Sequence, residues 1–95
     1  LYGLDKAKVA YIITQQTGPV VEALTHDLGR GVTLLHGQGA WSGQEKQVLM
    51  CAFKQRQIVA IKQTVKELDP EAFLIVCDAH EVLGHGFRLY HPNEI

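Results

Sequence analysis

The chain has 95 residues, 46% of them hydrophobic, and nine basic against ten acidic side chains give a net charge of -1. This length predicts one domain with its own core, covering residues 1–95. The balanced charge argues against nucleic-acid binding, which requires a basic surface. Because the sequence starts at Leu1 rather than at methionine, we expect it to be a piece of a longer protein.

The first part of the chain predicts a strand, a helix and a second strand. Residues 8–14 are rich in the β-branched and aromatic side chains that strands favour. Thr17 is a suitable helix cap, Pro19 fits a first helical turn, and apolar residues then recur at helical spacing. Gly29 is a plausible helix terminator, and residues 32–36 predict the second strand.

The second part predicts two more strands around a second helix. Residues 46–54 read as the third strand, joined to the second by an extended hairpin loop. A spacing of three, four and three predicts a helix through Ile58, Ile61, Val65 and Leu68. It ends at Asp69, because the residue before a proline leaves the helical region. Residues 72–77 predict the fourth strand, 87–90 a possible short strand, and 91–95 a polar tail.

This order, βαββαβ, predicts an α+β ferredoxin-like fold, a four-stranded antiparallel sheet with two helices on one face. The first and third strands then lie at the centre and the others at the edges. We expect the loop after the second strand and the segment after the fourth to share one end of the sheet. They would sit at opposite edges, roughly 14 Å apart, too far for one subunit to enclose a small ligand.

The strands are apolar on both faces, although two helices cover only one face of such a sheet. An antiparallel sheet with one solvated face normally alternates apolar and polar residues, and residues 9–13, 48–53 and 73–77 do not. An uncovered apolar face is an interaction site or an aggregation liability. We therefore expect a homo-oligomer, with a trimer as one arrangement.

Two glycine-rich segments, residues 36–43 and 81–88, are the candidate ligand sites. Neither has the spacing of a dinucleotide fingerprint or of a phosphate-binding P-loop. Glycines permit positive φ and close approach of a ligand, a cation attracts anions and an indole offers a stacking face. The candidate ligand-binding residues are Gly37, Gly39, Trp41, Gly43, Lys46, Gly84, His85, Gly86 and Arg88. The alternative is that the first segment is simply a flexible hairpin loop.

Other chemistry finds little support in the sequence. Cys51 and Cys77 each lie in an apolar run, which predicts two buried free thiols in a reducing compartment. The five histidines lack the cysteine partners and helical pairing typical of zinc sites. Ser42 has no nucleophile elbow around it. We expect no metal, no cofactor and no enzymatic activity.

Four motifs stand in order along the chain: RGVT at 30–33, GQGAWSG at 37–43, LDPEAF at 68–73 and EVLGHGF at 81–87. Together they resemble an uncharacterised C-terminal domain of YitT-type bacterial membrane proteins. The resemblance implies a cytosolic domain that follows a bundle of membrane helices. It also implies similarity to PII-like trimers, which bind nucleotides between subunits, although the hairpin loop here is much shorter. That arrangement would bring Gly37, Gly39 and Lys46 of one subunit to Gly84, Gly86 and Arg88 of the next.

The leading hypothesis is a regulatory or ligand-sensing domain that binds a small anion or nucleotide between subunits at the cytoplasmic face of a membrane. Its own membrane-spanning region would be its main partner. One alternative is a scaffold that oligomerises the membrane part and binds nothing. Another is an amino-acid-binding module of the ACT kind, which would use a turn at Gly18 and Pro19.

Overall fold

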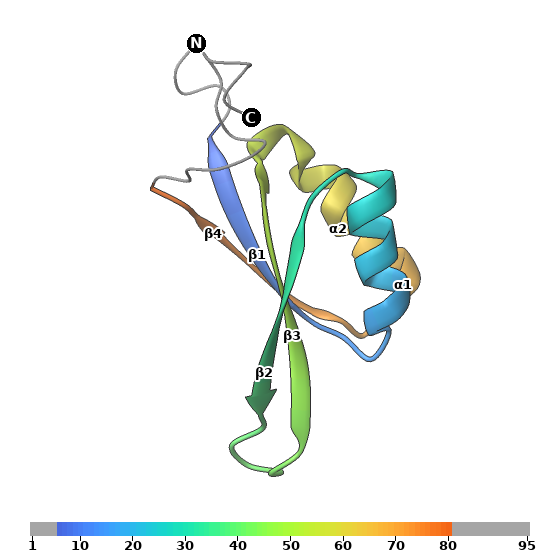
Figure 1. Cartoon of the computed structure of the whole chain (residues 1–95), viewed down its shortest axis with the longest axis vertical. Coiled ribbons are helices and arrows are strands. Elements are labelled where there is room, and N and C mark those ends of the chain that lie inside the picture. Colours follow the sequence, from blue (N-terminus) through green and yellow to red (C-terminus); the bar gives the residue numbers. More distant parts are fainter. Residues whose placement is uncertain (1–5, 81–95) are drawn as a thin grey trace.

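The computed structural model describes residues 6–80, which form a sheet with two helices against one of its faces (Figure 1). The elements in chain order are β1 (Ala7–Ile13), α1 (Thr17–Glu22), β2 (Val32–Gln38), β3 (Glu45–Lys54), α2 (Ile58–Leu68) and β4 (Phe73–Asp78). The sheet order is β2-β3-β1-β4 with every neighbouring pair antiparallel. The predicted ferredoxin-like α+β fold, with β1 and β3 at the centre, is confirmed.

The core lies between the helices and the face of the sheet that they cover. Alternate residues of the two central strands point into it, as the period of two in a strand dictates. Its largest fully buried side chains are Phe53, Ile12, Leu24, Leu49, Ile61, Val20, Val65 and Cys51. Burying each large apolar side chain in this way contributes about 1.5–3 kcal/mol to the stability of the folded state. This layer is therefore the main source of hydrophobic stabilisation in residues 6–80.

The ends of α1 differ in part from the prediction. The expected cap, Thr17, is already the first helical residue, and Gln16 precedes it without a side-chain capping bond. The helix continues through a π-helical turn at Ala23–Asp27. The terminator is as predicted: Gly29 has φ +70°, and the next amide, Arg30 N, donates to the Leu24 carbonyl at 3.0 Å. Glycine suits this left-handed position because it has no Cβ.

The turn after α2 is held to the turn after β1 by one carboxylate. Asp69, only 7% exposed, accepts hydrogen bonds from Thr14 Oγ1 at 2.6 Å and from the Gln15 amide at 3.2 Å. It also accepts one from the Glu71 amide at 3.0 Å. The Thr14 bond is the main reason that the pKa of Asp69 lies below its usual range. The carboxylate therefore fixes the end of the sheet from which the β2–β3 loop projects.

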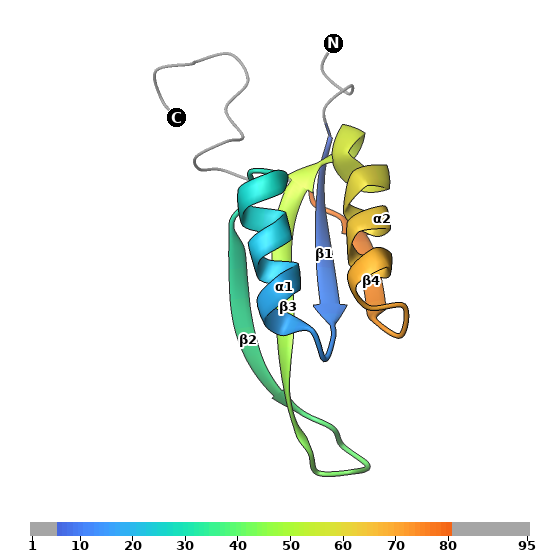
Figure 2. The same cartoon turned by 90° about the vertical axis from the view of Figure 1, so that its right-hand side faces the viewer.

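Strand direction overturns one expectation about the glycine segments. Because β1 and β3 are antiparallel, Ile13 at the end of β1 pairs with Val48 and Lys8 at its start pairs with Phe53. The β2–β3 loop thus lies beyond the end of β1, whereas β4 finishes at Asp78, beside Lys8 (Figure 2). The prediction that the two segments share one end of the sheet is wrong. The second segment, residues 81–88, lies outside the described residues.

Candidate functional site

Within residues 6–80, the face of the sheet opposite the helices is uncovered and apolar (Figure 1). Its side chains form three cross-strand rows, two of which span all four strands. The rows are Leu35–Val48–Ile13–Phe73, Thr33–Met50–Tyr11–Ile75 and Ala52–Val9–Cys77. We call these eleven residues the open face; none of them carries a charge. The prediction from the sequence that the strands are apolar on both sides is confirmed.

Exposure on the open face is greatest on the edge strands. Phe73 is 59% exposed, Ile75 42% and Leu35 38%, while residues of the central strands are half-buried by their neighbours. Polar groups normally take such positions in a monomer. Exposed aromatic and branched side chains in continuous rows are typical of an interaction surface.

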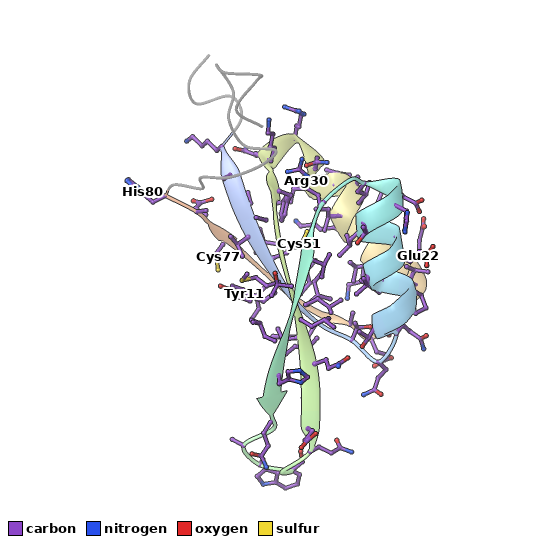
Figure 3. All side chains as sticks on the ribbon, in the orientation of Figure 1. Tyr11, Glu22, Arg30, Cys51, Cys77 and His80 are labelled. Carbon is purple, nitrogen blue, oxygen red and sulfur yellow. The ribbon has the colours of Figure 1, made fainter. Side chains whose placement is uncertain are left out.

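The two cysteines separate onto opposite faces. Cys51 lies between the sheet and the helices, whereas Cys77 projects from the open face together with Tyr11 (Figure 3). Cys51 is fully buried, and burial raises the pKa of its thiol to about 11. The expectation that Cys77 is also a core thiol is wrong. Its position alternates with Val76, which packs against the core, so Cys77 must face outward.

The β2–β3 hairpin extends beyond the rest of the sheet as a two-stranded arm (Figure 2). The last contact of β3 with β1 is at Val48, while its pairing with β2 continues through Lys46–Gly37 to Glu45–Gln38. Both strands therefore run further than the apolar pattern indicated. We call residues 36–47 the arm. Neither α1 nor α2 lies over it.

Hydrogen bonds order the tip of the arm. The Gly39 amide donates to the Gln44 carbonyl at 2.8 Å, and the Gly43 amide donates to the Gly39 carbonyl at 2.8 Å. Gln38 Nε2 donates to the Gly43 carbonyl at 3.1 Å. Gly43 has φ +73°, and a Cβ on Gly39 would lie 2.7 Å from Ser42 Oγ. The backbone thus requires glycine at position 43, whereas a Cβ at position 39 would displace only the Ser42 side chain. The hydrogen bonds at the tip favour an ordered loop over a flexible one.

The side chain at the tip projects away from the described part of the domain. Trp41, the single tryptophan of the chain, is 99% exposed. Tryptophan is among the most costly side chains to leave in water, since burying it removes about 150–250 Å² of mostly apolar surface. An ordered loop that holds an indole away from its own domain is typical of a docking element.

Five of the predicted ligand residues, Gly37, Gly39, Trp41, Gly43 and Lys46, lie together on the arm. The other four, Gly84, His85, Gly86 and Arg88, lie outside the described residues. Lys46 lines two hollows. One is a shallow depression along the arm, lined by residues 36–38 and 45–47. The other, of about 270 Å³, separates the base of the arm from the turn after β1.

The second hollow is polar and incomplete. Its walls are Gln44, Glu45, Lys46 and Gln47 on one side and Ile13, Thr14, Gln15 and Thr17 on the other. The hollow is partly open to solvent and slightly smaller than the clefts of about 300–1,000 Å³ that usually enclose a drug-sized ligand, so enclosing one would require a further wall. The sequence did not indicate Thr14, Gln15 or Thr17 as site residues, because isolated polar residues at a strand end give no distinctive signal. An aspartate directly before a proline is a turn signal that pointed to Asp69.

The turn on which the ACT-like interpretation depends does not form. Gly18 and Pro19 lie in the first turn of α1 rather than in a loop, so that alternative loses its proposed binding segment. Within residues 6–80, no group of three or more histidine, cysteine or acidic side chains is arranged to hold a metal ion. No helix in this same stretch has the length and apolar character that crossing a membrane requires.

Comparison with known proteins places this geometry in a bacterial context. The chain is 44% identical over 86 residues to an uncharacterized protein in the cccA 5' region of Bacillus sp. PS3, covering 90% of this chain and 57% of that protein. It is 42% identical over 86 residues to the membrane protein YvjA of Bacillus subtilis, of which it spans 31%. YitT of the same organism is 25% identical over 75 residues, 79% of this chain and 27% of YitT.

A crystal structure of a DUF2179 protein from Eubacterium ventriosum matches with a TM-score of 0.68 and 32% identity. The match covers 77% of this chain and the whole of that one. The relatives YvjA and YitT, both UPF0750 membrane proteins, confirm the resemblance to YitT-type proteins. A family model described as "Uncharacterized protein conserved in bacteria (DUF2179)" matches residues 30–84, and the chain belongs to this family.

Proposed function

We propose that this chain is a self-associating, non-catalytic domain of a membrane protein, and that its copies meet through the open face. The observation that carries the proposal is the set of three uncharged rows on the side of the sheet that neither α1 nor α2 covers. Two such faces can stack about 10 Å apart, as sheets do in β-sandwiches. Stacking would remove Phe73 and Ile75 from water.

Self-association at the cytoplasmic face of a membrane would link the membrane parts of neighbouring copies. The membrane-protein relatives support attachment to a membrane region. The chain spans less than a third of YvjA and YitT, which leaves most of their length for that region. In this proposal the domain sets the spacing and number of the membrane parts, and it serves as a scaffold whether or not a ligand binds.

The proposal predicts that a charge on the open face prevents association. Ile75→Lys places a cation on an edge strand where the side chain is 42% exposed, so folding should tolerate it. Val59→Lys places the same charge on the outer side of α2, where Val59 is 60% exposed, and serves as the matched control. Light scattering coupled to size-exclusion chromatography should show the parent chain and Val59→Lys as oligomers and Ile75→Lys as a monomer. A monomeric parent chain would refute the proposal.

We infer a second candidate function, the sensing of a small anion or nucleotide between subunits, from the incomplete polar hollow at the base of the arm. Lys46 supplies a cation there, and the backbone of Gly37 lies opposite it in the hairpin. A neighbouring copy would provide the missing wall. Amide and hydroxyl groups of Gln44, Gln15 and Thr17 would supply hydrogen bonds to the ligand.

Thermal unfolding against nucleotides, cyclic dinucleotides, amino acids and inorganic phosphate tests this second function. A ligand at about 100 times its dissociation constant stabilises the folded state by about 2.7 kcal/mol. For a domain of this size, that raises the Tm by roughly 10 °C or more. Lys46→Gln should abolish the shift, whereas Lys62→Gln, on the exposed side of α2, should preserve it. No shift with any member of the panel leaves the scaffold function alone.

A further inference from the structure

The open face is small for a stable interface on its own. Four strands spaced about 4.8 Å apart and seven residues long give a plan area of roughly 19 by 23 Å, on the order of 400 Å². A standard protein–protein interface buries about 800 Å² on each partner. Face-to-face stacking therefore reaches only about half of the usual area, and a further element has to contribute.

The arm is the element that can add surface to the interface. It continues about 10 Å past the last row of β1, a rise of three residues at ~3.3 Å each, before the loop begins. A two-stranded hairpin without a covering layer is marginally stable in water, yet the hydrogen bonds between Gly39, Gly43 and Gln44 order its tip. Its loop, residues 39–44, contains no charged side chain, so burying it requires no desolvation of an ion.

The arm cannot reach the open face of its own copy. It extends β2 and β3 away from the sheet, and Trp41 at its tip is 99% exposed. Nothing in residues 6–80 covers this indole, and a second molecule could. A nucleic acid is a poor fit, because the arm carries a single lysine, Lys46, directly beside Glu45, and therefore offers no basic surface. The uncharged rows of the open face match the chemistry of the indole.

We propose that Trp41 is an intermolecular anchor, and that the arm of one copy reaches past the stacked rows to lie against the exposed edge of the open face of a second copy, where Phe73 and Ile75 lie. The inference rests on the proposed self-association and specifies how it is completed. Trp41 adds about 150–250 Å² of buried area, and the uncharged loop adds more, which brings the interface toward the standard size. Anchors of this kind are enriched in tryptophan. The contact joins two different surfaces, so it closes either reciprocally in a dimer or around a ring.

Because the chain has a single tryptophan, its fluorescence reports on the tip of the arm alone. The emission maximum of the 95-residue chain is recorded from low to high micromolar concentration, together with its mass by light scattering. We expect a blue shift that follows the rise in mass. Trp41→Ala should weaken association by about 30-fold, the equivalent of about 2 kcal/mol for a tryptophan anchor. Val59→Ala, which removes apolar surface from the helix side, should leave it unchanged. Ile75→Lys should abolish both the shift and the oligomer.

Three other results would overturn the anchor. If the mass rises while the emission stays constant and Trp41→Ala associates like the parent, the arm is not involved and the open-face proposal stands. If the parent chain is monomeric at every concentration, both proposals fail. If phosphatidylcholine vesicles shift the emission while the mass without vesicles stays that of a monomer, the tip docks on a lipid surface instead of on a second copy.

Discussion

Two valines on α2 offer a sharp test of which side of the domain is covered. Val65 is fully buried against the sheet and Val59 is 60% exposed on the same helix. Substitution by alanine removes two methyl groups from either residue. At Val65 the lost transfer free energy is about 1.6 kcal/mol, at ~0.8 kcal/mol for each group. The cavity adds about 24 cal/mol per Å³, which raises the expected loss to about 2–3 kcal/mol.

The same change at Val59 leaves no cavity. Alanine is the better helix former by a few tenths of a kcal/mol, so Val59→Ala should be neutral or slightly stabilising. Thermal unfolding followed by circular dichroism, at one fixed protein concentration, should show the Tm of Val65→Ala lowered by about 8–24 °C and that of Val59→Ala within a few degrees of the parent. Equal losses at both positions would mean that the outer side of α2 is also buried, and would move the expected interface from the open face to the helices.

Three further predictions concern single residues. Asp69→Asn should destabilise the domain at neutral pH. Because folding lowers the pKa of Asp69, the carboxylate stabilises the folded state fully only above the unfolded pKa of about 3.9. The difference in unfolding free energy between parent and variant, measured in urea, should therefore vanish as the pH falls through the folded pKa. Gly43→Ala should speed amide exchange in the arm but not in α2, because a φ of +73° costs other residues about 1–2 kcal/mol. The control is Gly31→Ala, which has open space around it and should show the same amide exchange as the parent. In thiol titration of the folded chain Cys77 should react quickly and Cys51 slowly, and equal rates would contradict the assignment of Cys51 to the core.

The fold could be predicted from the sequence because the spacing of its apolar residues indicates the helices and strands. The spacing of three, four and three placed α2 within the bounds Ile58–Leu68, and both helix terminators, Gly29 and Asp69, were identified from backbone chemistry alone. A run of β-branched and aromatic residues located the first strand, and apolar runs located the other three. The apolar character of both faces of those strands was also evident from the residues themselves, because it requires only the absence of alternation.

The predictions from the sequence were wrong where the same residues are compatible with more than one conformation. Thr17 can cap a helix or begin one, and the choice depends on Gln16 and the turn after β1 rather than on Thr17 itself. The arm was underestimated because a hairpin ladder continues through residues such as Gln38 and Glu45 that show no apolar pattern. Cys77 was assigned to the core because an apolar run does not reveal which face each residue takes.

The sequence grouped five of the nine candidate residues correctly, but it did not indicate how they lie relative to the end of β4. Gly37, Gly39, Trp41, Gly43 and Lys46 were selected as one group, and they do lie on one arm. Their relation to the segment that follows β4 depended on strand direction, a property of the whole sheet that no local motif encodes. That single misassignment placed both glycine-rich segments at one end of the sheet.

In the two functions proposed above, ligand binding and assembly depend on the same arm. The arm forms one wall of the hollow of about 270 Å³ beside Lys46, and the same arm is the element that we expect a neighbouring copy to contact. A neighbouring copy held against the arm would supply a further wall, and a free arm would lack it. Ligand affinity should therefore rise with protein concentration, because ligand and partner would stabilise the same position of the arm. By the same linkage, a ligand of this site should tighten association, and Trp41→Ala should weaken ligand binding although the indole does not line the hollow.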